Sequence, residues 1–508
     1  MRQAARRWGD KPALLPPGAP AMSFAALDAL ADDVARGLIA AGMAAFERVA
    51  VWAPNSCEWI AAAIAIQRAG GVLVPLYERL KGREVAEILD RAGAGMVVTT
   101  AALAAMLEGH DLPRLRRSVC LDAGWREFLE AGKSVAPAAL AAREAAVTPD
   151  SISDIMFTSG TTGRPKGGVF RQSSSLAAAR IMQDYNGASE ADVFCPMGTF
   201  AHVGGYKQGW LTALVSGCAI CWGEAMDPGS VLKLIAERGV TIIPAAPITW
   251  AGILDHPDRA SFDLSLLRFA ATGATTIPPD LVRRMVAELG LEQVGTGYGM
   301  TETCGMDAYT RPEDPAEKVV STVGQAAPDT VIRIFDADGC DLGPDETGEI
   351  LVRSPRLLVE YCDDPAATAA AFTADGWFRT GDLGSYDTDG YLRIADRLKD
   401  MYIINGLNVY PAEIERALGT IAGVAQCAVV GVAEPVKGEV GAAFIVRAPG
   451  VALTGDEIFA WARANLASYK LPKYVIFVDD LPRTAMGKVV KPELAQMPEL
   501  KQMLENKR

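Results

Sequence analysis

Short runs of branched aliphatic residues alternate with longer segments of helical character through the first part of the chain. Arg48–Trp52 and Val72–Pro75 flank the helical segment Glu58–Arg68, and Val240–Pro244 and Leu267–Ala271 flank a second helical segment. Short Val/Ile-rich runs that alternate with helices predict parallel sheets covered by helices. The fold class predicted for this part of the chain is therefore α/β.

The pattern changes near Val319, where β-type runs follow one another without helices between them. Val331–Phe335, Glu349–Val352 and Tyr391–Ile394 are short and are separated by Asp/Gly turns. Such runs predict a small β subdomain, over about residues 319–397.

A charged cluster, Asp396–Asp400, interrupts this pattern, and we expect a domain boundary near residue 398. The segment after it contains three strand-like runs and a helix, at Ala428–Val432, Ala443–Val446, Val475–Val478 and Gly455–Leu466. We therefore predict an N-terminal domain over 1–397 and a small α+β domain over 398–508.

Composition narrows the classes of function. A chain of 508 residues exceeds the usual size of a single core, and half of its residues are hydrophobic. The net charge of −13 argues against nonspecific binding to nucleic acid or to an anionic membrane. Nine scattered cysteines predict reduced thiols in a cytoplasmic protein rather than a disulfide framework.

The most apolar stretch, about 61–76, is broken by Gln67 and Arg68, which makes it too short and too polar to span a bilayer. Arg6 and Arg7 precede no apolar run, so no export signal is expected. We therefore expect no stable membrane insertion.

A loop rich in glycine and hydroxyl residues follows the apolar run Ile155–Phe157. It consists of Thr158, Ser159, Gly160, Thr161, Thr162, Gly163, Arg164, Pro165, Lys166 and Gly167. Glycines permit turns that aim backbone N–H groups at one point, and a lysine supplies a point charge for phosphate oxygens. The alternative is a polar surface turn. Since a Walker A loop needs GxxxxGK followed by Ser or Thr, we predict a phosphate loop of another kind.

A second loop, Tyr298-Gly299-Met300-Thr301-Glu302, combines an aromatic ring with a hydroxyl and a carboxylate. Mg²⁺ takes hard oxygen ligands from one or two carboxylates and from phosphates, and the ring of Tyr298 could stack on a purine. By itself this loop is equally consistent with a packed tyrosine and the start of a helix. The interpretation as a Mg²⁺ and purine site therefore depends on the presence of the phosphate loop in the same chain.

Two further motifs carry polar groups between glycines. Asp382 lies in Gly376–Gly384, where a carboxylate can accept hydrogen bonds from a ribose diol or can form an ordinary Asp turn. Lys488 ends the loop Pro482–Lys488, and the alternative for it is a solvated charge.

Together these motifs resemble the ANL superfamily of adenylate-forming enzymes, which includes acyl-CoA synthetases, luciferases and peptide-synthetase adenylation domains. The resemblance covers essentially the whole chain. The matching motifs are TSGTTGRPKG at 158–167, ATGA at 271–274, YGMTE at 298–302, TGD at 380–382, DRLKD at 396–400 and GK at 487–488. The resemblance implies a large N-terminal domain of two helix-covered sheets with the β subdomain, and a small mobile C-terminal domain. ATP, Mg²⁺ and CoA are the implied cofactors and co-substrates.

The resemblance also implies roles for individual residues on the ATP side. The residues that would contact the β- and γ-phosphates are Thr158, Ser159, Gly160, Thr161, Thr162, Gly163 and Lys166. Gly273, Ala274 and Tyr298 would flank adenine, with Gly299 in the same loop. Thr301 would contact the α-phosphate and Glu302 would hold Mg²⁺.

The remaining implied roles lie toward the C-terminus. Asp382 and Arg397 would hold the ribose, and Lys399 occupies the position of the family's hinge residue. Lys488 would bridge the substrate carboxylate and the α-phosphate. Gly406 would admit the pantetheine arm of CoA.

The chemistry of such a reaction suits this composition. A carboxylate is already a nucleophile, so no Ser/His/Asp triad is required, and the chain has only three histidines. The repulsion between a carboxylate and a polyphosphate must be overcome by a lysine and Mg²⁺ through charge stabilisation and positioning. We therefore predict an acid:CoA ligase that forms an acyl-adenylate and pyrophosphate, and then an acyl-CoA thioester and AMP.

The loop Phe200–Gly205 resembles the family's substrate-side loop. It lacks the aspartate that pairs with an α-ammonium group, which favours an acid without an α-amine. His202 would gate the acyl pocket and assist catalysis, or would be a hydrogen-bonded structural histidine. The predicted pocket comprises His202, Gly205, Gly297 and Met300, and Gly297 is expected to leave room for a bulky or long acid.

At finer grain, Asp396–Glu413, Arg311–Asp314 and the pair Tyr206-Lys207 resemble bacterial CoA ligases of steroid degradation, of the type that acts on a hydrindane-dione propanoate. A medium-chain or alicyclic acid stays open, as does an aryl acid. The motifs are also consistent with an enzyme that loads a separate carrier protein, with luciferase-type chemistry and with an inactive nucleotide-binding scaffold. A homodimer is left open as the assembly.

Overall fold

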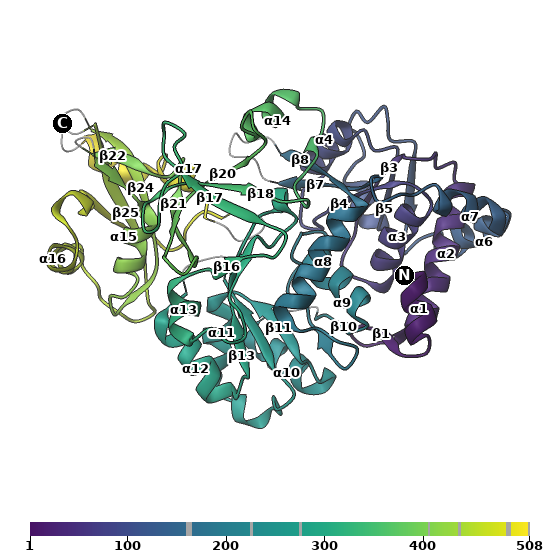
Figure 1. The fold of residues 1–508 in the computed structure, drawn as a ribbon, viewed down its shortest axis with the longest axis horizontal. Coiled ribbons are helices and arrows are strands. Elements are labelled where there is room, and N and C mark those ends of the chain that lie inside the picture. Colours follow the sequence, from purple (N-terminus) through teal and green to yellow (C-terminus); the bar gives the residue numbers. More distant parts are fainter. Residues whose placement is uncertain are drawn as a thin grey trace. The chain divides into compact units, whose positions relative to one another are not determined.

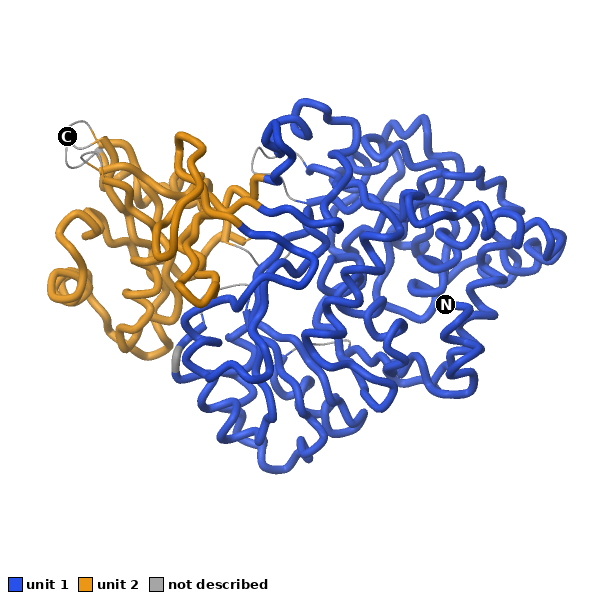
Figure 2. Tube along the Cα trace, in the orientation of Figure 1, with its two compact units in different colours: residues 1–332, 352–378 blue, residues 333–351, 379–508 orange. Residues whose placement is uncertain are grey.

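The computed structural model describes residues 1–158, 165–223, 227–273, 277–404, 407–434, 438–483 and 489–505. The chain forms two compact units. The larger comprises residues 1–332 and 352–378, and the smaller comprises residues 333–351 and 379–508 (Figure 2). The division falls within strands β17 (Val331–Phe335) and β18 (Gly348–Arg353), and at the start of β20 (Phe378–Tyr386). The boundary near residue 398 and the hinge at Lys399 stay predictions.

A seven-stranded sheet of the larger unit holds both ends of the phosphate-loop motif. Its order is β19-β8-β7-β4-β3-β5-β6, and the pairs among β7, β4, β3, β5 and β6 are parallel (Figure 1). The strands are β3 (Arg48–Trp52), β4 (Val72–Leu76), β5 (Met96–Thr99), β6 (Arg117–Cys120), β7 (Ile152–Thr158), β8 (Lys166–Arg171) and β19 (Glu360–Tyr361).

Side chains alternate across this sheet, so that each strand contributes to two cores. Val49 and Val51 of β3 pack in one core with residues of α2 (Phe24–Ala40) and α3 (Cys57–Arg68). Ala50 and Trp52 pack in another core, with residues of α4 (Gly82–Ala92). Burial on both faces explains why the strand reads as a continuous apolar run.

A second seven-stranded sheet of the larger unit has the order β13-β12-β11-β9-β10-β1-β2. Its strands are β1 (Pro12–Leu15), β2 (Met22–Ser23), β9 (Val193–Phe194), β10 (Ala219–Cys221), β11 (Ile242–Ala245), β12 (Phe269–Thr272) and β13 (Gln293–Gly295). Helices α10 (Pro228–Arg238), α11 (Pro247–Leu254) and α12 (Pro279–Leu289) contribute to the core on this sheet (Figure 1). The prediction of two helix-covered sheets is therefore confirmed.

Smaller elements complete the larger unit. A three-stranded sheet joins β14 (Gly297–Tyr298), β15 (Ala308–Tyr309) and β16 (Gln325–Ala326). The remaining helices include α1 (Arg2–Trp8), α5 (Ala101–Ala105), α6 (Trp125–Gly132), α7 (Pro137–Ala145), α8 (Gln172–Asn186), α9 (Leu211–Ser216), α13 (Ala316–Ser321) and α14 (Pro365–Ala371). A single π-helical turn, Tyr206–Trp210, leads into α9.

The smaller unit is α+β. A four-stranded sheet has the order β17-β18-β20-β21, and a second sheet joins β23, β22, β25 and β24, with β26 parallel to β25. The further strands are β21 (Leu392–Arg397), β22 (Tyr402–Ile404), β23 (Leu407–Val409), β24 (Val424–Glu434), β25 (Gly438–Arg447) and β26 (Tyr474–Phe477). The helices include α15 (Pro411–Leu418), α16 (Gly455–Asn465), α17 (Lys491–Leu494) and α18 (Pro498–Glu505).

The helices begin where the sequence supplies caps. Ser56 accepts the Trp59 N–H at the start of α3, and Thr454 and Glu457 form a reciprocal capping box at the start of α16. Throughout the described ranges, no helix combines the length and apolar character needed to cross a membrane. All nine cysteines lie in described ranges and are free thiols, as predicted.

Candidate functional site

The phosphate-loop motif connects the two strands of a β-hairpin. Strand β7 ends at Thr158 and β8 begins at Lys166, and these two residues pair across the antiparallel ladder. The hairpin therefore fixes both ends of the loop at one point on the sheet. Five of the predicted phosphate-binding residues lie outside the described residues, namely Ser159, Gly160, Thr161, Thr162 and Gly163.

The structure brings the hairpin to the second predicted loop. Thr158 Oγ1 lies 3.4 Å from Glu302 Oε1, although the two residues are 144 positions apart. The hydroxyl at the entry to the phosphate loop therefore faces the carboxylate predicted to hold Mg²⁺.

Tyr361 completes this cluster and was not indicated by the sequence. Its hydroxyl donates to Glu302 Oε1 at 3.2 Å, and the Lys166 ammonium lies 5.2 Å from its ring centroid. Burial, together with the neighbouring Glu302 charge, raises the pKa of Tyr361 well above its usual value, so that the phenol remains a donor. Its strand, β19, is only two residues long and pairs with β8, so the sequence offered no periodic signal for it.

Gly299 lets the Tyr298–Glu302 loop turn back on itself. A Cβ at residue 299 would lie 1.6 Å from the Gly305 carbonyl oxygen, and the Gly305 N–H donates to the Met300 carbonyl at 2.9 Å. After this close approach the chain forms the 3₁₀ turn Thr301–Thr303, which presents Glu302. The turn ends at Cys304 in a left-handed conformation, with φ of 63°, which is uncommon for a residue other than glycine.

A buried ionic network holds the far end of this turn. Arg356 is fully buried and donates to the Thr303 carbonyl at 3.1 Å and to the Asp329 carboxylate at 2.9 Å. Thr303 Oγ1 donates to Asp307, whose pKa is raised by burial to about 7, although Arg356 opposes the shift. Nothing in the sequence indicated this network, because its members are scattered charged residues without a motif.

The acyl-side loop is tightly packed. His202 Nδ1 accepts the Gly204 N–H at 3.2 Å, as expected of a structural histidine, and its gating role stays a prediction. A Cβ at Gly205 would lie 2.0 Å from the Thr199 carbonyl oxygen. Met300 is half-buried and packs against the main core of this unit.

That Gly297 leaves room for an acid stays a prediction, and the structure shows what lies beside it. A Cβ at residue 297 would lie 2.3 Å from Met306 Sδ and 2.8 Å from the Ala308 carbonyl oxygen. The Met306 side chain therefore lies beside Gly297.

The predicted adenine-side residues lie at strand ends. Gly273 follows β12, and a Cβ there would make an ordinary contact with Thr296 Oγ1 at 3.4 Å. Tyr298 is nearly buried, and its carbonyl accepts the Asp307 N–H at 2.8 Å. Ala274 lies outside the described residues, and stacking on a purine stays a prediction.

The predicted ribose pair is assembled within the smaller unit. Asp382 and Arg397 lie opposite one another on β20 and β21, with Arg397 Nε 3.6 Å from Asp382 Oδ1. Nearby, the buried Asp396 accepts the Ala412 N–H at 2.7 Å and so ties the start of α15 to β21. Lys399 is exposed in the turn after β21, whereas Gly406 and Lys488 lie outside the described residues.

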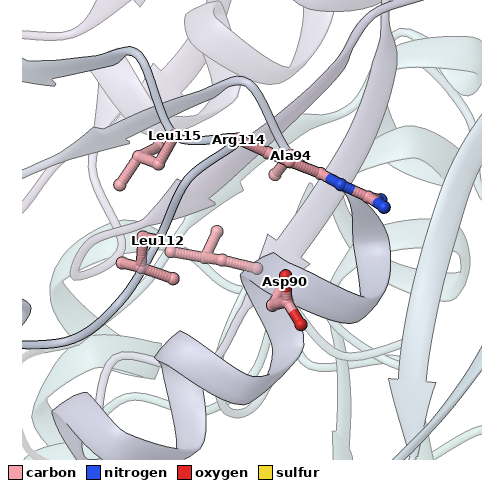
Figure 3. Close-up of a pocket in the computed structure, with 6 residues that line it drawn as sticks. Asp90, Ala94, Leu112, Arg114 and Leu115 are labelled. Atoms are coloured by element: carbon pink, nitrogen blue, oxygen red, sulfur yellow. The ribbon is translucent and has the colours of Figure 1, made fainter.

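Glu302 is the carboxylate predicted to hold Mg²⁺ at this site. In the described parts of the chain, no group of three or more His, Cys, Asp or Glu side chains could hold a metal ion. Glu302 lies beside the hydroxyls of Thr158 and Tyr361, and its role as a Mg²⁺ ligand stays a prediction. A separate small hollow, lined by Leu89, Asp90, Ala94, Leu112, Arg114 and Leu115, contains none of the predicted site residues (Figure 3).

An α/β fold in which Thr158, at the entry to a glycine- and hydroxyl-rich segment, lies beside the Glu302 carboxylate is the arrangement expected of an enzyme that activates its substrate with a nucleotide. Residues 1–362 match the AMP-binding enzyme model, and residues 413–488 match its C-terminal domain. The chain belongs to the AMP-binding enzyme family. The predicted resemblance to adenylate-forming acyl-CoA synthetases is therefore confirmed.

Relatives align over nearly the full chain. A (7a-methyl-1,5-dioxo-octahydro-inden-4-yl)propanoyl:CoA ligase of Mycobacterium tuberculosis is 44% identical over 91% of this chain and 91% of its own length. A ligase of the same description from Rhodococcus jostii is 39% identical over 97% of this chain and 96% of its own length. ATP-bound MatB from Rhodopseudomonas palustris has a TM-score of 0.88 at 30% identity, covering 97% of this chain and 98% of its own. The predicted class, an ATP-dependent acid:CoA ligase acting through an adenylate, is confirmed, with ATP and CoA as its substrates.

Proposed function

We propose that this protein ligates CoA to a steroid-derived propanoate that carries a fused bicyclic diketone. The observation that supports this substrate is the full-length similarity, at 44% and 39% identity, to two ligases described as acting on such an acid. Relatives described as an indoleacetate–CoA ligase and a feruloyl-CoA synthase are 35% and 36% identical. An aryl acid is therefore the second candidate.

In the proposed first step, the acid's carboxylate attacks the α-phosphorus of ATP and pyrophosphate leaves. The loop from Thr158 to Lys166 holds the β- and γ-phosphates, and Thr301 contacts the α-phosphate. Glu302 would hold Mg²⁺, which would neutralise phosphate charge. Because Thr158 and Tyr361 both contact Glu302, its carboxylate is oriented before the nucleotide binds.

The smaller unit supplies the remaining groups in this proposal. Asp382 and Arg397 hold the ribose, and Lys488 bridges the acid carboxylate and the α-phosphate. For the second step the smaller unit turns about Lys399, Lys488 withdraws and the CoA thiol passes Gly406. The thiol loses its proton and attacks the acyl carbonyl, and the bond to AMP breaks so that AMP leaves. The acid lies near His202, Gly205 and Met300, with Met306 in the wall beside Gly297.

Pyrophosphate release tests this proposal. Purified protein is assayed with ATP, Mg²⁺ and a panel of acids, with and without CoA: octanoate, palmitate, benzoate, indoleacetate, cyclohexanecarboxylate and a bicyclic diketone propanoate. We expect sustained turnover only with CoA, and the highest kcat/KM with the bicyclic acid. A higher kcat/KM with indoleacetate or benzoate than with the bicyclic acid would instead support an aryl acid as the substrate. Release that CoA does not stimulate would instead support carrier loading.

We further propose a cytoplasmic location, since ATP and CoA are supplied there and all nine cysteines are free thiols. A homodimer is the proposed assembly. Sedimentation equilibrium of the purified chain measures its mass, and a value equal to that of one chain would overturn the dimer.

A further inference from the structure

A fully buried ion pair lies behind the proposed ATP site, and none of the roles described above uses it. Lys207 Nζ lies 2.9 Å from Asp154 Oδ2, and both side chains are inaccessible to solvent. The ammonium also lies 3.2 Å from Cys304 Sγ and 3.6 Å from the Phe170 ring centroid. Such a pair is expensive to desolvate, and apolar residues of similar volume are often at least as stable. Stability alone is therefore a weak reason for its presence.

The partner carboxylate is closely surrounded by hydroxyl groups. Asp154 Oδ1 accepts hydrogen bonds from Ser153 Oγ at 2.5 Å and from Ser175 Oγ at 3.0 Å, with the Tyr206 hydroxyl at 3.5 Å. Tyr206 in turn accepts from Gln67 Nε2 at 2.7 Å. A network with this many defined partners fixes Asp154 on β7 and gives the ammonium of Lys207 one place to lie.

The three segments that meet at Lys207 are those that form the proposed site. Asp154 lies on β7, four residues before Thr158 enters the phosphate loop. Cys304 directly follows the turn Thr301–Thr303, in the left-handed conformation described above. Lys207 itself lies in the π-helical turn Tyr206–Trp210, directly after the acyl-side loop, and such turns occur often at functional sites.

We infer that Lys207 is a positioning residue for adenylation, which sets the Glu302 turn against the start of the phosphate loop through Cys304 and Asp154. The inference rests on the proposed function. Its physical basis is that the Thr158–Glu302 approach needs both elements held in register, and that small displacements of positioning groups cost much of the rate.

The test uses the double variant Lys207→Met with Asp154→Asn. It removes both charges of the pair, so no unpaired buried charge remains. We expect it to fold and to lose about tenfold to a hundredfold in the adenylation rate, with a raised KM for ATP. Thioesterification from preformed acyl-adenylate, which needs neither pyrophosphate nor Mg²⁺, should stay within about threefold of wild type. Adenylation constants within twofold of wild type, or equal losses in both steps, would overturn the inference.

The control is a partly buried ion pair of the same unit, Arg68 with Asp28, which belongs to a network with Arg2 and Asp32 and contacts no site segment. Arg68→Met with Asp28→Asn should lower the melting temperature but keep both half-reactions. If the Lys207 double variant fails to fold, Cys304→Ala removes the buried sulfur that contacts the Lys207 ammonium, and it should raise the KM for ATP. An unchanged KM would overturn the inference.

A readout without any acid separates this inference from the proposed substrate. MgATP should raise the melting temperature of the wild-type protein, and the shift should be smaller in the Lys207 double variant and in Cys304→Ala. Equal shifts in wild type and both variants would count against the positioning role, even if no acid of the panel is ligated. Conversely, failure of every acid with normal ATP shifts would count only against the proposed substrate.

Discussion

Glu302 lies beside two hydroxyl groups, and removing one of them tests what they do. Tyr361→Phe keeps the ring near Lys166 but loses the 3.2 Å hydrogen bond to Glu302. A hydrogen bond to a charged group contributes about 1.5–3 kcal/mol, so we expect kcat/KM for ATP to fall by roughly tenfold to a hundredfold. Steady-state pyrophosphate release at varied MgATP measures this. The control Tyr386→Phe loses a hydroxyl that donates to the Leu342 carbonyl, and should leave the kinetics unchanged.

Asp307 makes stability depend on pH in a defined direction. Its pKa in the folded protein is raised to about 7 by burial, whereas an unfolded aspartate titrates near about 3.9. The folded state therefore retains a proton that the unfolded chain has lost, and its contribution to stability is present in acid and disappears as the pH rises toward 7. The melting temperature of wild type minus that of Asp307→Asn should fall between pH 5 and pH 7. A difference independent of pH would contradict this.

At the scale of elements, runs of branched aliphatic residues are where the sequence predicts best. Arg48–Trp52 and Val331–Phe335 have the predicted bounds, because a run that is buried or regularly paired carries its own periodic signal. The two-residue strand β19 has no such signal. The antiparallel pairing of Thr158 with Lys166 was also not predicted, because the composition of a loop does not show whether the two strands beside it pair with each other.

The Tyr298–Glu302 loop depends on one backbone contact, at Gly299. Gly299→Ala would place a methyl group 1.6 Å from the Gly305 carbonyl oxygen, so the backbone that carries Glu302 must move. We expect adenylate formation to fall by about a hundredfold or more, since displacement of positioning groups is costly. Gly455→Ala is the matched control, because no atom lies within 4 Å of its Cβ position. Normal pyrophosphate release by Gly299→Ala would show that the loop relaxes without consequence.

At the scale of the whole molecule, the sequence predicted residues that lie in motifs, but it could not predict contacts between residues far apart in the chain. The motifs identified Thr158, Glu302, Asp382 and Arg397, because each lies in a recognisable string of residues. Arg356 lies 53 positions from Thr303, whose carbonyl it binds. Charged residues of this kind have no local pattern, so only the folded chain shows that they support the site.

The two half-reactions should depend on different residues of the smaller unit. Lys488→Ala should abolish adenylate formation but leave thioesterification of preformed acyl-adenylate largely intact, because only the first step needs a cation between carboxylate and α-phosphate. Lys399→Pro should do the reverse, because proline fixes φ at the turn where the hinge must change conformation. Single-turnover assays of each half-reaction measure both effects, with exposed Lys501→Ala as control. Equal loss of both steps in Lys488→Ala would contradict the two-conformation cycle. Normal half-reactions in Lys399→Pro would place the hinge elsewhere, since a rigid turn at residue 399 would then not limit the exchange between the two steps.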